Sequence, residues 1–125
     1  MKLVVEESES TALLAYLSGH GPMYTSRVAA VELRRAVRRH DNPTAGDQVE
    51  LVLATLRLIE LDDELSRNAG LVQPTALRTL DAIHVAAAVA LGDECEAFVS
   101  YDDRLNTAAH AAGLEVRSPG VAGNT

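Results

Sequence analysis

The segment that decides the fold is Thr79–Asp103, TLDAIHVAAAVALGDECEAFVSYDD. Its first part is almost wholly apolar, which predicts a buried helix over Leu80–Leu91 that Thr79 caps and Gly92-Asp93 ends. Its second part, Ala97–Ser100, has the composition of a buried strand. Strands that alternate with helices in this way indicate an α/β protein whose parallel sheet is covered by helices on both faces.

The same alternation extends outward along the chain. Before the quoted segment, apolar spacing and cap residues predict a helix over 6–17, a strand over 23–25, a helix from Ser26 to Arg39, a helix opened by Thr44 or Asp47 after a turn at 41–43, a strand over 58–61 and a short helix capped by Asp62. After it, they predict a helix over 103–112 that ends at Gly113 and a strand over 114–116.

An aliphatic core is expected, because 47% of the residues are hydrophobic and only 3% are aromatic. The residues expected to face inward are Val28, Val31 and Ala36 on the helix over 26–39, Val49, Leu53 and Leu56 on the next helix, and Leu65 and Ala69 on the short helix. A chain of 125 residues fits one compact domain. We expect it to span residues 1–118, followed by a flexible tail over 119–125.

The formal net charge of −7 argues mildly against a protein that holds nucleic acid through Lys and Arg alone. It permits an enzyme whose acidic site recruits phosphate through bound cations, and it suits a basic protein partner. The single cysteine, Cys95, excludes an intramolecular disulfide. No apolar run approaches the roughly 20 residues that span a bilayer, so a cytoplasmic protein without a membrane partner is expected.

Three acidic residues are expected near the carboxyl ends of strands, where open parallel sheets bind ligands. Asp102 follows the strand over 97–100, and Asp81 lies in the first turn of the apolar helix. Glu32 lies about two turns into the helix over 26–39. Each has a simpler interpretation: Asp81 as a charge favoured by the helix dipole, Asp102 as a helix cap, and Glu32 as one half of a surface ion pair.

Carboxylates that converge repel one another, so a fold keeps them together only around a positive group. Mg²⁺ or Mn²⁺ is the natural choice, because hard cations prefer oxygen ligands. If the three acids meet in space, the sequence therefore predicts a divalent-metal site that acts on phosphoryl groups.

Three segments resemble motifs of PIN-domain ribonucleases, especially VapC toxins of type II toxin–antitoxin pairs. They are TSRVAAVELRRA over 25–36, LRTLDAIHVAAA over 77–88 and FVSYDDRL over 98–105, and their order and spacing match over essentially the whole chain. The resemblance implies a three-layer α/β fold and an endoribonuclease that uses Mg²⁺ or Mn²⁺ to activate a water. It also implies a VapB-like antitoxin as partner, RNA as substrate, and a homodimer.

Carried over to this chain, the resemblance assigns Glu32, Asp81 and Asp102 as catalytic metal ligands. Ser100 stands where the family often has a Thr that orients a metal-bound water. The basic residues predicted to contact RNA or the antitoxin are Arg78, Arg104, Arg34 and Arg38. For Arg34 and Arg38 a solvated helix face is an equally good interpretation.

The family's pattern begins with a central strand that ends in an Asp, shortly before a segment like Lys2–Glu7. On this resemblance the first, central strand and its Asp are expected to be missing, and Met1 is interpreted as a misassigned start, which the upstream DNA tests. Two other functions stay open. One is a catalytically impaired module that binds antitoxin or dimerises; the other is a phosphatase-like protein with Asp102 as nucleophile.

Overall fold

The computed structural model describes residues 22–39 and 43–120. The chain divides into two compact units, residues 1–59 with 119–125 and residues 60–118. The positions of the two units relative to one another are not determined. The predicted helix over 6–17 and the expectation of a missing first strand lie outside the described residues.

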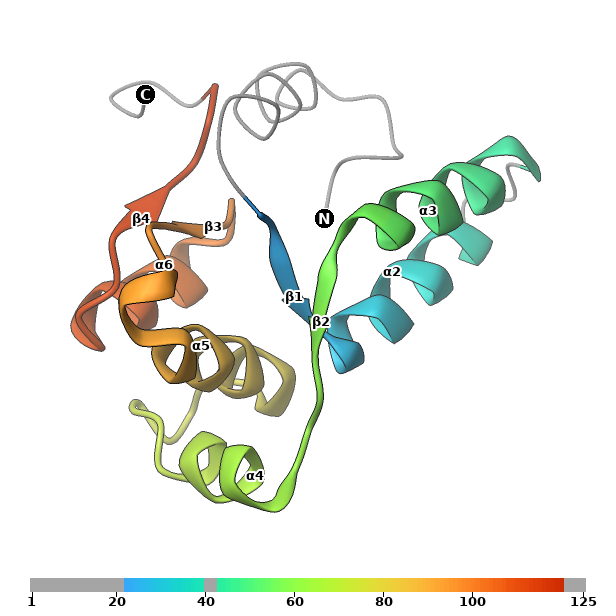
Figure 1. The fold of residues 1–125 in the computed structure, drawn as a ribbon. Helices are drawn as coiled ribbons and strands as arrows, with labels where there is room; N and C mark the ends of the chain where they lie inside the picture. Colours follow the sequence, from blue (N-terminus) through green and yellow to red (C-terminus); the bar gives the residue numbers. More distant parts are fainter. Residues whose placement is uncertain (1–21, 40–42, 121–125) are drawn as a thin grey trace. The chain divides into compact units, whose positions relative to one another are not determined.

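In the first unit, two helices follow one strand along the chain and precede a second strand, and the two strands pair with each other. Its elements are β1 (Tyr24–Ser26), α2 (Arg27–Arg39), α3 (Pro43–Thr55) and β2 (Arg57–Ile59). The strands β1 and β2 are parallel, with Tyr24 opposite Arg57 (Figure 1). The hydroxyl of Ser26 accepts a hydrogen bond from the Ala29 N–H at 3.0 Å, which confirms that Ser26 caps α2.

The packing of α2 against α3 corrects one prediction about the core. The buried cluster is Ala30, Leu33, Val37, Val49 and Leu53. Val31 was expected to face inward and is 51% exposed. The inward face of α2 runs through positions 30, 33 and 37, which are spaced three and four apart, and position 31 lies off that stripe. On α3 the predicted burial of Val49 and Leu53 is confirmed, whereas Leu56 follows the end of the helix and is only partly buried against the cluster.

The helix α3 begins earlier than the sequence predicts. We expected a turn through Pro43 and a helix opened by Thr44 or Asp47, whereas Pro43 is the first residue of α3. Proline is well suited to a first helical position, because the N–H that it lacks has no partner there and its φ is already helical. The predicted start of the helix was wrong because Pro43 was interpreted only as a turn residue.

The second unit packs three α-helices with a second pair of strands. Its elements are α4 (Asp63–Gly70), α5 (Thr79–Leu91), a 3₁₀ turn (Gly92–Glu94), β3 (Phe98–Val99), α6 (Asp103–Ala111) and β4 (Val116–Arg117). The strands β3 and β4 are parallel and pair Phe98 with Val116. The predicted strands over 97–100 and 114–116 are thus shorter or shifted, and the predicted burial of Leu65 and Ala69 is confirmed.

One hydrophobic cluster joins α5 to α6 in this unit. Val85 of α5 is fully buried against Leu105, Ala108 and Ala109 of α6, and Phe98 packs onto the cluster from β3. The small alanine side chains let the two helices approach closely. The cluster therefore fixes α5 and α6 against each other.

Most helix ends of the second unit follow the predicted residues. The Asp62 carboxylate accepts from the Leu65 N–H at 2.8 Å and caps α4. Gly113 has φ +90°, a left-handed conformation suited to glycine, and ends α6. Thr79 is a correction: it is the first residue of α5, and the cap position is Arg78, which makes no side-chain cap hydrogen bond.

The α/β class with parallel strands is confirmed. Among the described residues the strands form two sheets of two strands each, one in each unit. The domain bounds of 1–118 stay a prediction. In the part of the chain that the structure describes, no helix is both long and apolar enough to cross a membrane.

Candidate functional site

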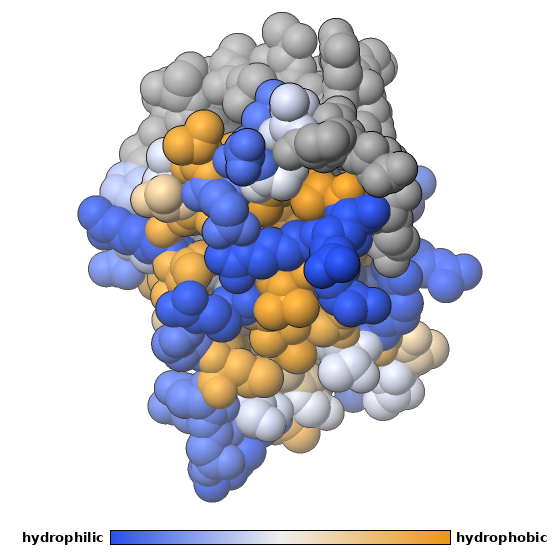
Figure 2. Space-filling view, turned by 90° about the vertical axis from the view of Figure 1, so that its right-hand side faces the viewer, coloured by the Kyte–Doolittle hydropathy of each residue, from blue (hydrophilic) through white to orange (hydrophobic). Residues whose placement is uncertain are grey.

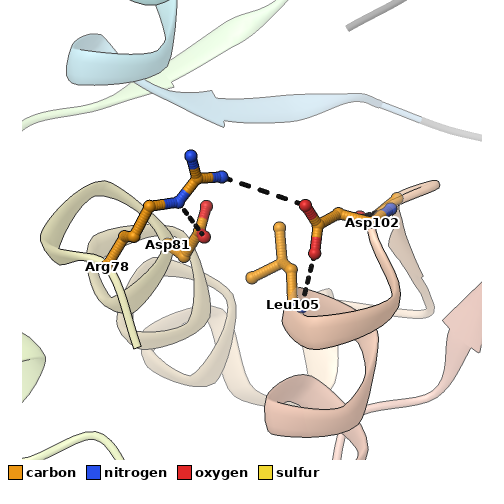
Figure 3. Close-up of polar contacts among 5 residues, drawn as sticks. Arg78, Asp81, Asp102 and Leu105 are labelled. Carbon is orange, nitrogen blue, oxygen red and sulfur yellow. Dashed lines mark hydrogen bonds and ion pairs between the residues drawn. The ribbon is translucent and has the colours of Figure 1, made fainter. Parts of the chain in front are cut away.

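A pocket of about 300 Å³ opens where α5 and α6 begin. Its lining residues are Ala76, Leu77, Arg78, Asp81, Asp102 and Arg104. Two of the three acids predicted from sequence are therefore in one pocket, although they come from different helices. Figure 3 shows the Arg78 guanidinium close to both carboxylates, with a different nitrogen directed at each.

Asp81 is held in the first turn of α5 and is 8% exposed. Its Oδ2 accepts a hydrogen bond from Arg78 Nε at 3.3 Å. A carboxylate that is nearly buried is costly unless it is paired, and Arg78 supplies that charge. The start of the helix favours the same negative charge, so the simpler interpretation of Asp81 and the functional one are compatible.

Asp102 is placed by the turn that leads from β3 into α6. Its Oδ1 accepts from the Leu105 N–H at 2.9 Å, which confirms the interpretation of Asp102 as a helix cap. Its Oδ2 lies 3.9 Å from Arg78 Nη2 and faces the pocket. One oxygen of Asp102 thus fixes the side chain, and the other lies on the side of the pocket where Asp81 is.

Ser100 acts on the turn rather than on the pocket. Its hydroxyl accepts a hydrogen bond from the Asp102 N–H at 3.1 Å, and Ser100 is not among the residues that line the pocket. In this structure its observed contact orients the backbone of Asp102. The predicted role of Ser100 toward a metal-bound water stays a prediction.

A hydrogen-bond network next to the turn that carries Asp102 was not predicted from the sequence. The Asn106 side-chain amide donates to the Ser100 carbonyl at 3.2 Å and to the Ser118 hydroxyl at 3.3 Å. Ser118 donates to the same carbonyl at 2.6 Å. These bonds tie the end of β3 to the end of β4 and hold the turn that carries Asp102. The available signal was an Asn one turn after a helix-capping Asp.

The third predicted acid, Glu32, and the predicted basic residues other than Arg78 lie in different parts of the structure. Glu32 is exposed on α2, in the first unit, so its place relative to the pocket stays a prediction. Arg34 makes two hydrogen bonds to Glu50 of α3, at 2.9 and 3.0 Å. Arg38 is exposed on α2, and Arg104 lines the pocket.

The Arg34–Glu50 pair gives a prediction about pH. The hydrogen bond from Arg34 lowers the pKa of Glu50, and the Glu50 carboxylate raises the pKa of Arg34. A depressed carboxyl pKa stabilises the fold above the unfolded-state pKa, and this contribution is lost as the pH falls through the folded-state pKa. Glu50→Gln should therefore lower the melting temperature slightly at pH 7 and not at about pH 3.

Melting curves of the parent and the Glu50→Gln variant at both pH values measure this effect. Arg34→Gln should remove the same increment, and the double variant should lose nothing further. A deficit of equal size at low pH would show that Glu50 acts through packing rather than through its charge.

The donor set of the pocket suits a hard divalent cation. Mg²⁺ keeps several waters and is usually held by only one or two carboxylates together with substrate phosphates. Asp81 and Asp102 supply two carboxylates that already flank a positive group. Within residues 22–39 and 43–120, no cluster of three or more His, Cys, Asp or Glu side chains is placed to hold a metal.

Comparisons with known proteins agree with these motifs. The family model described as "PIN domain" matches residues 1–111. Ribonuclease VapC47 of Mycobacterium tuberculosis (strain CDC 1551 / Oshkosh) is 37% identical over 124 residues, covering 96% of this chain and 91% of that protein. Ribonuclease VapC46 of the H37Rv strain is 39% identical over 119 residues, covering 95% and 91%.

A third relative, Ribonuclease VapC35 of the same species, is 40% identical over 126 residues, covering 98% of this chain and 93% of that protein. No solved structure matches the chain significantly. The similarity to the three relatives extends over nearly the full length of each protein and includes the segments that carry Asp81 and Asp102.

Proposed function

This chain belongs to the PIN-domain family, among the VapC-type ribonucleases, and from that premise we propose that it is the toxin of a type II toxin–antitoxin pair. Its activity is the endonucleolytic hydrolysis of RNA with Mg²⁺ or Mn²⁺ in the cytoplasm. The observation that carries the proposal is that Asp81 and Asp102 line one pocket and are both paired with Arg78. The ribonuclease names of the relatives favour a catalytic chain over the impaired module.

In the proposed site, the carboxylates of Asp81 and Asp102 would hold the cation. Glu32 is the third proposed metal ligand, on the strength of the family motif around it. Bound there, the cation lowers the pKa of a water and offsets negative charge on the phosphoryl group. The cap hydrogen bond from Leu105 and the bond from Ser100 keep Asp102 in position, which limits the reorganisation needed for binding.

The net charge of −7 would repel RNA, and the charges that line the pocket explain how the chain could still bind it. Arg78 and Arg104 balance Asp81 and Asp102, so the lining is formally neutral. A divalent cation makes the same lining positive and able to attract a phosphodiester. RNA binding is thus coupled to the cation rather than to the charge of the whole chain, and Arg78 and Arg104 are the proposed phosphate contacts.

The proposed protein partner is a VapB-like antitoxin that covers the site, and a homodimer is the proposed assembly. A protein partner is supported by large hydrophobic residues that stay exposed in the first unit, among them Val31 at 51% and Leu51 at 71%. Figure 2 shows small groups of hydrophobic residues among hydrophilic ones on the face that it draws. The net charge of −7 favours a basic segment in that partner.

Cleavage of a labelled single-stranded RNA by the purified full chain tests the proposal. We expect products with Mn²⁺ or Mg²⁺, none with excess EDTA, and recovery when the cation is restored. A DNA strand of the same sequence serves as the substrate control. Cleavage that continues unchanged in EDTA would refute the metal dependence, and a chain that leaves RNA intact with either cation would refute the ribonuclease.

A further inference from the structure

Arg78 forms ion pairs with both acids of the pocket. Its Nε lies 3.3 Å from Asp81 Oδ2, and its Nη2 lies 3.9 Å from Asp102 Oδ2 (Figure 3). The guanidinium therefore spans both carboxylates with two different nitrogens. The Asp102 oxygen that it faces is the one that does not cap α6, since Oδ1 accepts from the Leu105 N–H.

Two carboxylates that both face one guanidinium also repel each other, and the negative charge costs most on Asp81 because that side chain is nearly buried. The Arg78 charge removes part of that cost without any bound ion. A divalent cation that binds both carboxylates brings a second positive group to the part of the pocket where the guanidinium lies. The guanidinium and the cation therefore compete for the two carboxylates.

We propose that Arg78 is a built-in counter-ion that holds the Asp81–Asp102 pair together before the metal binds and that the metal must displace. The proposal rests on the proposed function for the nature of the displacing cation. The side chain of Arg78 is 78% exposed, so it has room to leave, whereas that of Asp81 is only 12% exposed and stays in place.

Displacement makes the apparent metal affinity weaker than the intrinsic one, because only molecules with the guanidinium withdrawn can bind the ion. Removal of the guanidinium must then strengthen binding. An arginine that served only to contact RNA would leave the metal affinity nearly unchanged. The direction of the change thus separates the two roles.

The test is Mn²⁺ binding to the full chain without RNA, measured by calorimetry or by the loss of free-Mn²⁺ electron paramagnetic resonance signal. Arg78→Gln is expected to bind Mn²⁺ about fivefold more tightly than the parent, the effect of losing one ion pair at the strong end of the exposed range. Arg78→Lys keeps the positive charge but loses the planar guanidinium with its several N–H donors, so its Mn²⁺ affinity should lie between those of the parent and Arg78→Gln.

Two reference variants assign the effect to the bridge. Asp81→Asn identifies the signal that belongs to this site. Arg104→Gln removes the same charge from the same pocket lining, and it should strengthen binding by less than about twofold, since the ion-pair contacts described for Arg78 are what the cation must break. Equal gains for Arg104→Gln and Arg78→Gln would overturn the proposal in favour of a general field effect.

Melting temperature gives a second readout that does not depend on affinity alone. In EDTA, Arg78→Gln should melt below the parent, because the carboxylates lose their counter-ion, and saturating Mn²⁺ should raise its melting temperature by more than it raises that of the parent. If the parent binds Mn²⁺ and Arg78→Gln binds it equally or more weakly, only this inference fails. If Asp81→Asn binds like the parent, the metal site of the proposed function fails with it.

Discussion

Asp81→Asn is expected to lower the rate of RNA cleavage by at least about 100-fold, because the pocket then keeps one carboxylate and loses half of its negative ligand charge. Asn has nearly the shape of Asp and can still accept from Arg78, so the fold should be retained. Initial cleavage rates at saturating Mn²⁺, compared with melting temperatures of the same preparations, separate a chemical loss from unfolding.

The matched control is Asp103→Asn. Asp103 is the first residue of α6, adjacent to Asp102, but it does not line the pocket. We expect its cleavage rate to stay within about twofold of the parent. Asp102→Asn should behave like Asp81→Asn, and it is a clean substitution, since Asn is as good a helix cap as Asp. Cleavage by Asp81→Asn at the parent rate would eliminate Asp81 as a ligand.

The largest effect on stability is expected for Leu105→Ala. Leu105 is 8% exposed and packs α6 onto Val85 of α5. The substitution should lower the free energy of unfolding by about 2–5 kcal/mol, which combines the lost burial of the side chain with the cavity left behind. For a domain with a total stability of about 5–15 kcal/mol, this is a large fraction. Urea denaturation followed by far-ultraviolet circular dichroism measures it.

A matched control for Leu105→Ala is Leu71→Ala. Leu71 lies in the same unit and is 75% exposed, so its truncation should change the free energy of unfolding by no more than about 0.5 kcal/mol. Leu105→Ala should also reduce RNA cleavage near its melting range, because α6 carries the cap that orients Asp102. A loss for Leu105→Ala no larger than that for Leu71→Ala would show that the α5–α6 cluster does not stabilise this unit.

The residues of the pocket were predictable to different degrees. Asp81 and Asp102 were identified from their places at helix starts and from the motifs around them, and the structure places both in one pocket. Arg78 was predicted only as a contact for RNA or antitoxin, because the sequence does not show that its side chain reaches two acids at once. Asn106 was missed, since its role depends on the ends of two strands meeting.

Local chemistry explains what the sequence by itself determined. The alternation of helices and strands, the caps Asp62 and Asp102, and the glycine that ends α6 follow from interactions within a few residues of one another, so the order of residues is enough to predict them. The family motifs indicate the chemistry of the acids in the same way, because a motif is also a local pattern.

Only the tertiary structure decided which side of α2 is buried and which positive charge is paired with both carboxylates. Both depend on contacts between segments far apart in the chain: α3 selects the inward face of α2, and the packing of α6 on α5 brings Asp102 to the guanidinium of Arg78. Such contacts are chosen by side-chain volume and by charge balance across elements, which the spacing of residues within one element does not encode.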